Sequence, residues 1–356
     1  MALVTRNVFI DTEFFVKANL DFNSRTIKSF EELCEKDEFK HITSTVVVKE
    51  INRKITEQIQ EALKGIKNFR RKAAVLKEYD DNNIRNLFVN INEDDIEQKA
   101  LNAFNDFLET SKTNVLDMTG VDLDEVIDMH FNQTSPFSAK IPNEFRDAFT
   151  LLAIRSALRN GEKIYVVSDD PDHKNFCEAN DSFVNIDTLS ALLDIYNKHN
   201  DKRTEFIDKF LESKKEDIIQ KLKMELEDAE AYNSSTWEDS EIESFEVIEL
   251  DDFEPQIIHL DDESCQITFD TSVKFMVYVT GPDTANGFYD KEDGRLYTFD
   301  SASNKEEQIK EFSVEIDLTF EIDGDNFIND EFDLHVKGLS RGIEFDVDET
   351  SFDDFR

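Results

Sequence analysis

The period of the hydrophobic residues changes once along the chain, and this change constrains the fold more than any other sequence feature. From residue 6 to about residue 200, short β-like runs alternate with segments of helical periodicity, a pattern typical of an α/β fold with a mostly parallel sheet. From about residue 243 onward the period is two, and turn signals such as "TGPD" and "KEDG" separate the runs. This second pattern predicts antiparallel strands.

Two domains and a linker are expected from this change, because 356 residues exceed the size at which one hydrophobic core stops growing. We expect an α/β domain over residues 1–200, a helical and acidic linker over 201–242, and an acidic antiparallel β-rich domain over 243–356. The expected strands of the first domain are "RNVFID", "KHITST", "KIYVVSD" and "DSFVNI". Its expected helices cover residues 26–36, 45–77, 94–110, 121–132, 143–160 and 186–199.

Neither a membrane segment nor a disulfide framework is indicated. The chain has no apolar run of about 18 residues, and an acid interrupts its first apolar run. Cys34, Cys177 and Cys265 are odd in number and widely separated, so buried free thiols are expected. We therefore expect a soluble cytoplasmic protein that does not contact membranes.

Charge restricts the partners of the chain. Its 80 Asp and Glu residues against 40 Lys and Arg residues give a formal net charge of -40, which repels nucleic acid at long range unless it is reversed locally. The acidity is concentrated in residues 225–263. Two interpretations of this segment stay open: a solubilising linker, or an internal mimic of nucleic acid that covers a basic surface.

Acidic residues follow two expected strands at the point where each strand ends. Asp11 follows "NVFI", and Asp169 and Asp170 follow "IYVVS". In an open α/β sheet, ligands bind beyond the carboxyl ends of the strands, near a switch in strand order. Glu50 and Asp147, each in an expected helix, can enter from the same side. The sequence therefore predicts a cluster of carboxylates at one edge of the sheet.

Such a cluster predicts a metal site. Carboxylates that meet at one point repel one another, and their pKa values rise unless a divalent cation neutralises them. Oxygen ligands favour Mg²⁺ or Mn²⁺, and we expect no histidine among them, since His173 after the acids is interpreted as a surface residue. A metal held in this way activates water and stabilises charge at a phosphodiester. The predicted chemistry is phosphodiester hydrolysis.

A basic segment leads away from the predicted site. Residues 49–77 hold nine Lys and Arg residues against three Glu residues. A positive helix at this place could bind a nucleic-acid backbone, and the alternative is an exposed helix whose charge is balanced by acids elsewhere. The residues expected to bind nucleic acid are Lys54, Lys64, Lys67, Arg70, Arg71 and Lys72.

The order of these acids resembles the pattern of the PIN-domain nucleases over roughly residues 5–200. The first Asp of that pattern matches Asp11 in "VFIDTEF", and its early Glu matches Glu50. Its helical Asp matches Asp147 in "FRDAFTLLAIRSAL". The resemblance is to the larger bacterial PIN-like proteins with a C-terminal extension, and it implies a three-layer α/β/α domain with a mostly parallel central sheet.

The last motif of the family pattern is a strand that ends in Thr or Ser, with Asp at the second and fourth positions after it. Ser168, Asp170 and Asp172 match this motif, and Asp169 is the intervening residue. Asp172 either supports the metal or caps the helix that begins at Pro171. Glu144, one turn from Asp147 on the same helix face, and Asp169 are secondary candidates.

The resemblance implies a metal-dependent endonuclease, with RNA as the preferred substrate and a toxin-like or anti-phage role as a further expectation. Its implied catalytic residues are Asp11, Glu50, Asp147 and Asp170, which would bind Mg²⁺ or Mn²⁺ together with Asp172. Two alternatives stay open: a structure-specific or single-strand DNA nuclease, or an inactive acidic module that binds proteins. The C-terminal β domain is expected to bind a protein partner or to mediate self-association.

Overall fold

The structure is a computed structural model that describes residues 2–78, 82–89, 92–138, 144–199, 203–323 and 326–349. It divides into two compact units, residues 1–199 and residues 200–356. Among the helices of the described residues, none combines the length and the apolar character needed to cross a membrane. The expected α/β fold, followed by an antiparallel β-rich region, is confirmed.

A parallel sheet of five strands forms the centre of the first unit, in the order β3-β2-β1-β4-β5. The strand order reverses between β1 and β4, and a crevice beyond the carboxyl ends of two such strands is where ligands bind in this class of sheet. The strands are β1 (Asn7–Ile10), β2 (Lys40–Ser44), β3 (Asn114–Leu116), β4 (Ile164–Val167) and β5 (Phe183–Ile186).

Helices connect these strands, and α3 is the longest of those in the first unit that the structure describes. Ser44 caps α3, since its side chain accepts a hydrogen bond of 3.2 Å from the Val47 amide. The helix expected over residues 45–77 ends at Lys72 and continues as a short 3₁₀ turn. The helices are α1 (Thr12–Lys17), α2 (Arg25–Glu35), α3 (Thr45–Lys72), η1 (Ala74–Glu78), α4 (Asn82–Asn86), α5 (Glu93–Thr110), α6 (Leu123–Asn132), α7 (Phe145–Ala157), α8 (Pro171–Glu178) and α9 (Leu189–Asn197).

The two central strands of this sheet are buried on both faces. Val8, Phe9 and Ile10 in β1, and all four residues of β4, are at most 1% exposed. Strands covered on both faces read as continuous hydrophobic runs in α/β proteins, which is why "NVFI" and "IYVV" carry no polar alternation. Their burial fixes the backbone from which Asp11 and Ser168 emerge.

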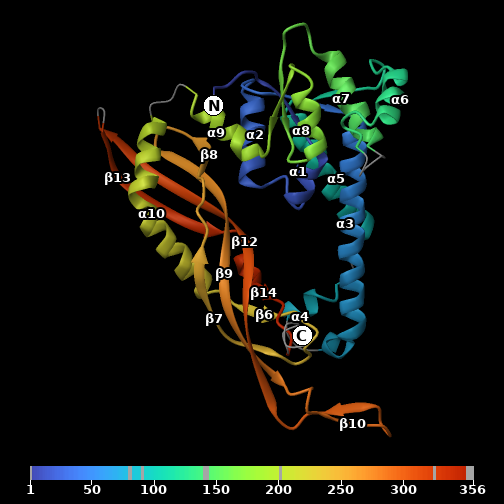
Figure 1. Cartoon of the computed structure of the whole chain (residues 1–356), viewed down its shortest axis with the longest axis vertical. Helices are drawn as coiled ribbons and strands as arrows, with labels where there is room; N and C mark the ends of the chain where they lie inside the picture. The colour runs from blue at the N-terminus through green and yellow to red at the C-terminus, as the bar shows by residue number, and fades with distance from the viewer. Residues whose placement is uncertain are drawn as a thin grey trace. The chain divides into compact units, whose positions relative to one another are not determined.

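The second unit is an antiparallel sheet packed against one long helix. The sheet has the order β13-β12-β9-β7, and β8 also pairs with β9. Helix α10 (Arg203–Glu227) contacts β7 and β13 (Figure 1). It buries Ile207, Ile218 and Leu222. We expected these residues within the 201–242 linker, and the structure gives this helix a packing role in the core instead. The strands are β7 (Glu241–Leu250), β8 (Gln256–Leu260), β9 (Ser264–Pro282), β12 (Ser301–Asp323) and β13 (Asn326–Val336).

Two small pairs of strands complete the second unit. One is an antiparallel ribbon of β10 (Phe288–Asp290) and β11 (Arg295–Tyr297). The other joins β6 (Ala231–Asn233) to β14 (Ile343–Phe345), which follows the short helix η2 (Leu339–Arg341). The parallel pairing of β6 with β14 ties the beginning of this unit to its last described strand.

Candidate metal centre

Asp11 lies at the carboxyl end of β1, beside the end of β4. Its backbone amide donates a hydrogen bond of 3.1 Å to the Val167 carbonyl, so the parallel pairing of the two strands continues to this residue. The side chain is only 8% exposed. It accepts a hydrogen bond of 3.2 Å from Ser168 Oγ. Burial raises the pKa of the Asp11 carboxyl to about 6.

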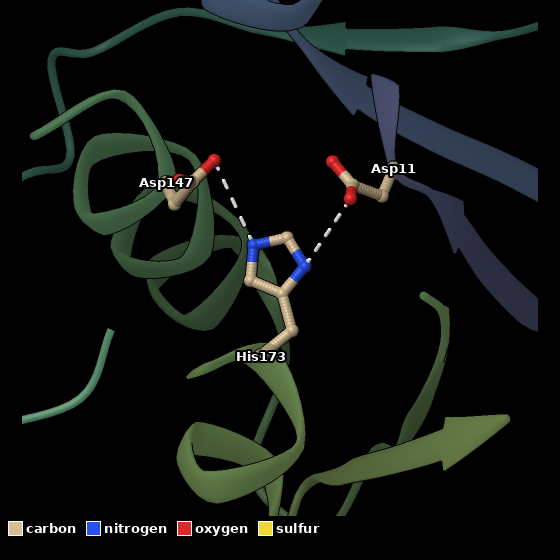
Figure 2. Close-up of side chains that lie close together, drawn as sticks. All are labelled: Asp11, Asp147 and His173. Carbon is tan, nitrogen blue, oxygen red and sulfur yellow. Dashed lines mark ion pairs between the residues drawn. The ribbon is translucent and has the colours of Figure 1, made fainter. Parts of the chain in front are cut away.

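Asp147 and His173 complete a compact group with Asp11 (Figure 2). His173 Nδ1 lies 3.6 Å from Asp11 Oδ2, and its Nε2 lies 3.6 Å from Asp147 Oδ1. Asp147 comes from the first turn of α7 and His173 from α8, so two helices and one strand bring the group together. Potential ligand atoms of the three side chains all lie within 4.8 Å of one another. The imidazole ring thus bridges the two carboxylates.

The charges of this group stabilise one another. Burial by itself lowers the pKa of His173, but the hydrogen bond to Asp147 and the charges of Asp11 and Asp147 outweigh it and raise that pKa to about 9. Burial opposes the ionisation of Asp147, yet its contacts with His173 and Glu144 hold its pKa below the usual range. At neutral pH His173 is therefore a cation between two acids. This is the place where a metal ion would also be attracted.

Ser168 connects three members of the site. Its Oγ lies 2.9 Å from His173 Nδ1, donates to Asp11, and accepts a bond of 3.2 Å from the Asp170 amide. A hydroxyl offers one donor and two acceptor positions, and here all three are used when His173 Nδ1 carries its proton. Ser168 is 3% exposed, so this small network fixes the ring orientation of His173.

The cap of α8 is Asp170 and not Asp172, for which capping was one of two expected roles. Asp170 caps α8, because its Oδ1 accepts a hydrogen bond of 2.7 Å from the Asp172 amide, and Pro171 is the first helical residue. The expectation that Asp172 could cap this helix is therefore wrong. The Asp172 carboxylate instead accepts a bond of 3.4 Å from Ser138. Its partial burial and the charge of Asp170 raise its pKa.

Glu144 shares a proton with Asp147. It precedes α7, and the hydrogen bond to Asp147, together with partial burial, raises its pKa to about 8. Its partner Asp147 stays ionised. The negative charges of Asp170 and Asp172 also contribute to the raised pKa of Glu144. Arg146, although close to Glu144 in the sequence, pairs with Glu50.

Glu50 lies beside the group but contacts other residues. Its carboxylate pairs with Arg146 and accepts a hydrogen bond of 3.3 Å from Thr12 Oγ1. Thr12 directly follows Asp11, and Arg146 directly precedes Asp147. Glu50 is therefore anchored to the neighbours of the two aspartates and not to the aspartates themselves. The guanidinium of Arg146 places a positive charge on this side of the site.

The remaining predicted residues lie outside the group. Asp169 is half exposed and pairs with Lys17 at 2.6 Å. On α3, Lys67 pairs with Glu93 at 2.7 Å, and Arg70 Nε donates to the Leu87 carbonyl. Other residues of the basic segment, among them Lys64, Arg71 and Lys72, are exposed along the same helix.

His173 is the residue that sequence reasoning placed wrongly, and a signal for it exists. The interpretation as a surface residue is contradicted, since His173 is 3% exposed. Counting from the cap at Asp170, the buried residues of α8 are His173, Phe176 and Cys177. They follow the i, i+3, i+4 spacing of an inward helix face. The assumption that no histidine accompanies the carboxylates is corrected by the same observation.

The donor set suits a divalent metal ion. Two carboxylates and one imidazole offer three ligand atoms from separate elements. The raised pKa of Asp11 shows that a buried carboxylate lacks full compensation by protein groups. Carboxylates suit Mg²⁺ and Mn²⁺, and imidazole suits the transition metals among the divalent ions.

Comparison with known families identifies the first unit. Residues 8–173 match the family model described as a PIN domain. The match begins in β1 and ends at His173, so it includes Asp11, Asp147 and the strand that precedes Asp170. Searches of curated proteins and of solved structures found no match to the chain.

Proposed function

Residues 8–173 belong to the PIN-domain family, whose members are nucleases, and from this premise we propose that the chain is a metal-dependent endonuclease. The observation that carries the proposal is the placement of Asp11, which is buried, and Asp147, which is partly buried, on either side of His173. The His173 imidazolium already compensates these two acids in the metal-free chain, yet the pKa of Asp11 stays raised, so a divalent cation would stabilise this carboxylate further. The family membership and the acidic group therefore support the same chemistry.

Asp11 and Asp147 are the groups we propose as metal ligands, with Asp170 and Asp172 as further candidates. When bound, a divalent cation supplies positive charge to the phosphodiester and activates water. Ser168 Oγ donates a hydrogen bond to Asp11 and fixes the orientation of its carboxylate. Protonated Glu144 donates a hydrogen bond to Asp147. These contacts orient the two carboxylates before any substrate arrives, which is the role of groups around metal ligands.

Arg146 is suited to contact a phosphate of the substrate. Its side chain is 55% exposed and pairs with Glu50 at the edge of the site. A guanidinium has five donors, and a bidentate contact with a phosphate leaves some of them for Glu50. In this proposal Glu50 positions Arg146, in addition to the metal-binding role that the family resemblance implies.

We propose RNA as the preferred substrate, as the family resemblance implies, and single-stranded or structured DNA as the second candidate. A defence or toxin-like role also stays a proposal and requires the nuclease activity. The test is cleavage of matched RNA and DNA oligonucleotides by the full chain with Mn²⁺, with Mg²⁺ and with excess EDTA. Asp147→Asn protein, purified in parallel, controls for contaminating nucleases. Cleavage that persists in EDTA would contradict metal dependence, and intact RNA and DNA under all conditions would contradict the nuclease proposal.

Charge reversal on α3 is expected to weaken nucleic-acid binding. Arg71 and Lys72 are exposed and form no ion pair with a described residue, so their charges are free to contact phosphates. Replacing both by Glu should weaken binding about ten- to a hundredfold and flatten its salt dependence, because fewer counterions are released. Fluorescence anisotropy with Asp147→Asn as the background measures binding without cleavage.

The matched control for this experiment is Lys163→Glu/Lys209→Glu, which changes the net charge by the same amount at exposed positions outside the basic segment. An equal loss of affinity in both proteins would show that only net charge matters. In that case the basic segment of α3 is no binding surface, and the alternative of a helix balanced by acids elsewhere is correct.

A further inference from the structure

Apolar side chains are exposed together on the ribbon of β10 and β11 in the second unit. We call residues 283–300 the aromatic ribbon. Phe288 is 63% exposed, Tyr289 is 57% exposed and Phe299 is 82% exposed. Scattered exposed apolar residues are normal, but a contiguous group of them marks an interaction surface.

The strand register of the aromatic ribbon places large apolar side chains on both of its faces. Phe288 lies opposite Tyr297, and Tyr289 lies opposite Leu296. Successive residues of a strand point to opposite faces, so each face of the ribbon carries a large apolar pair. An isolated two-stranded ribbon is marginally stable in water. A partner that buries one of these faces would stabilise it.

The aromatic ribbon is acidic. Residues 283–300 contain five Asp and Glu residues against one Lys and one Arg. Among the acids, Glu292 and Asp300 lie at the surface. The partner for such a surface combines apolar side chains with positive charge, since complementary charge selects partners and aligns them.

One surface of the described residues has this combination, at the end of α3. We call residues 64–77, with residues 84–89 beside them, the α3 end patch. Residues 64–77 hold six Lys and Arg residues and no acid. The patch also exposes large apolar side chains: Ile66, Phe69, Val75, Leu87 and Val89.

We propose that the aromatic ribbon of one copy docks onto the α3 end patch of a second copy. Both surfaces leave aromatic and aliphatic side chains in water, and their charges are opposite in sign. In a dimer with twofold symmetry each copy supplies one ribbon and one patch, so the two contacts close the assembly and no filament forms. The chain is strongly acidic, and this local pairing of charges offsets the long-range repulsion between the copies.

Docking would cover Arg71 and Lys72, which we propose as contacts to nucleic acid. The dimer would then compete with substrate for α3 and hold the nuclease in a less active form at low substrate concentration. This consequence rests on the proposed function, whereas the docking itself does not. The docking experiment is therefore carried out in the absence of nucleic acid.

Sedimentation velocity of the full chain tests the proposal over a range of protein concentrations. We expect a monomer–dimer equilibrium at about 50 mM and at about 500 mM salt, because salt screens both the attraction between the two surfaces and the long-range repulsion between the copies. Phe288→Ser/Phe299→Ser should raise the dimer dissociation constant about tenfold or more. Phe131→Ser is the matched control, since Phe131 is a similar aromatic residue, 79% exposed on α6, and it should leave the equilibrium unchanged.

Charge exchange identifies the two surfaces. Arg71→Glu/Lys72→Glu and Glu292→Lys/Asp300→Lys should each weaken the dimer about tenfold, and the combination of all four changes should restore it. Monomer at all concentrations in low salt would overturn the proposal, as would a dimer that none of these variants weakens. Loss of the dimer in both charge variants without recovery in the combination would also overturn the pairing of these two surfaces.

Discussion

Replacing Asp11 with asparagine is expected to abolish cleavage and, in the same protein, to raise the free energy of unfolding of the metal-free chain. The first effect follows from the loss of a proposed metal ligand, and a decrease of about two to three orders of magnitude is expected. The second follows from burial, because the carboxylate is 8% exposed and its pKa is raised from 3.8 to about 6. A pKa shift of this size means that the folded chain disfavours the ionised carboxylate by about 3 kcal/mol.

The direction of the pH dependence follows from the raised pKa. The folded chain binds the Asp11 proton more tightly than the unfolded chain, so this group stabilises the fold below about pH 4, the pKa of an unperturbed Asp. That contribution is lost as the pH rises through about 6. The stability advantage of Asp11→Asn should therefore be largest at neutral pH and should shrink towards pH 4. Urea unfolding of both proteins in EDTA at a series of pH values measures it.

Asp169→Asn is the control for this comparison. Asp169 is half exposed and pairs with Lys17 at the surface, so its replacement should change the free energy of unfolding by less than about 1 kcal/mol at each pH. If Asp11→Asn instead destabilised the chain at neutral pH, the bond from Ser168 and the charge of His173 would outweigh the burial of the carboxylate. The interpretation of Asp11 as an uncompensated acid would then be wrong.

Removal of the His173 side chain is expected to destabilise the metal-free chain by about 3 kcal/mol at pH 7, since its pKa is raised from 6.5 to about 9. The folded chain holds the imidazolium between Asp11 and Asp147, and His173→Ala leaves these acids without their cation. Because the pKa is raised, the stabilisation is complete below about pH 6.5 and is lost as the pH rises through about 9. The difference between wild type and variant should decrease over this interval.

His41→Ala is the matched control. His41 is also buried, at 2% exposure, but burial lowers its pKa to about 3. This histidine is neutral in the folded chain over the whole interval, so the loss on its removal reflects packing and should not vary between about pH 7 and pH 10. A pH-independent effect of His173→Ala, parallel to that of His41→Ala, would show that His173 is held by packing alone.

Metal rescue separates two roles of His173. If the ring substitutes for a cation in the metal-free protein, Mn²⁺ should raise the melting temperature of His173→Ala more than that of the wild type, because the metal replaces the missing charge. If the ring is a ligand, the variant should lose both stability and its response to Mn²⁺. A thermal shift series with increasing Mn²⁺ for both proteins distinguishes these results.

Much of the first unit was predictable because its elements are long or continuously apolar. Strands β1, β2, β4 and β5 lie where the hydrophobic runs predicted them, and Ser44 caps α3 as its residue type indicates. The sequence does not predict α1, α4 or β3. Strand β3 has only three residues and none is buried, so no hydrophobic period marks it. Its position at the edge of the sheet is set by its pairing with β2.

In the second unit, too, a long strand was predictable from the sequence and the role of one helix was not. Alternation along β9 predicted an antiparallel strand, and Val273, Phe275, Val277 and Val279 all face the core. The fate of α10 was not predictable from its own residues, because an amphipathic helix can serve as a linker or can cover a sheet. Its contacts with β7 and β13 decide that it covers the sheet.

Strands β1, β2, β4 and β5 and the acids that follow buried strands were predictable, because both depend on local runs of residues. The sequence placed Asp11 and Asp147 as members of one acidic site, and the structure brings their carboxylates to either side of one ring. The identity of this ring as His173, the cap of α8 at Asp170 and the pairing of Glu50 with Arg146 follow from the packed fold. Those choices depend on which of several competing charges lies nearest once the elements have packed, and no local pattern records that distance.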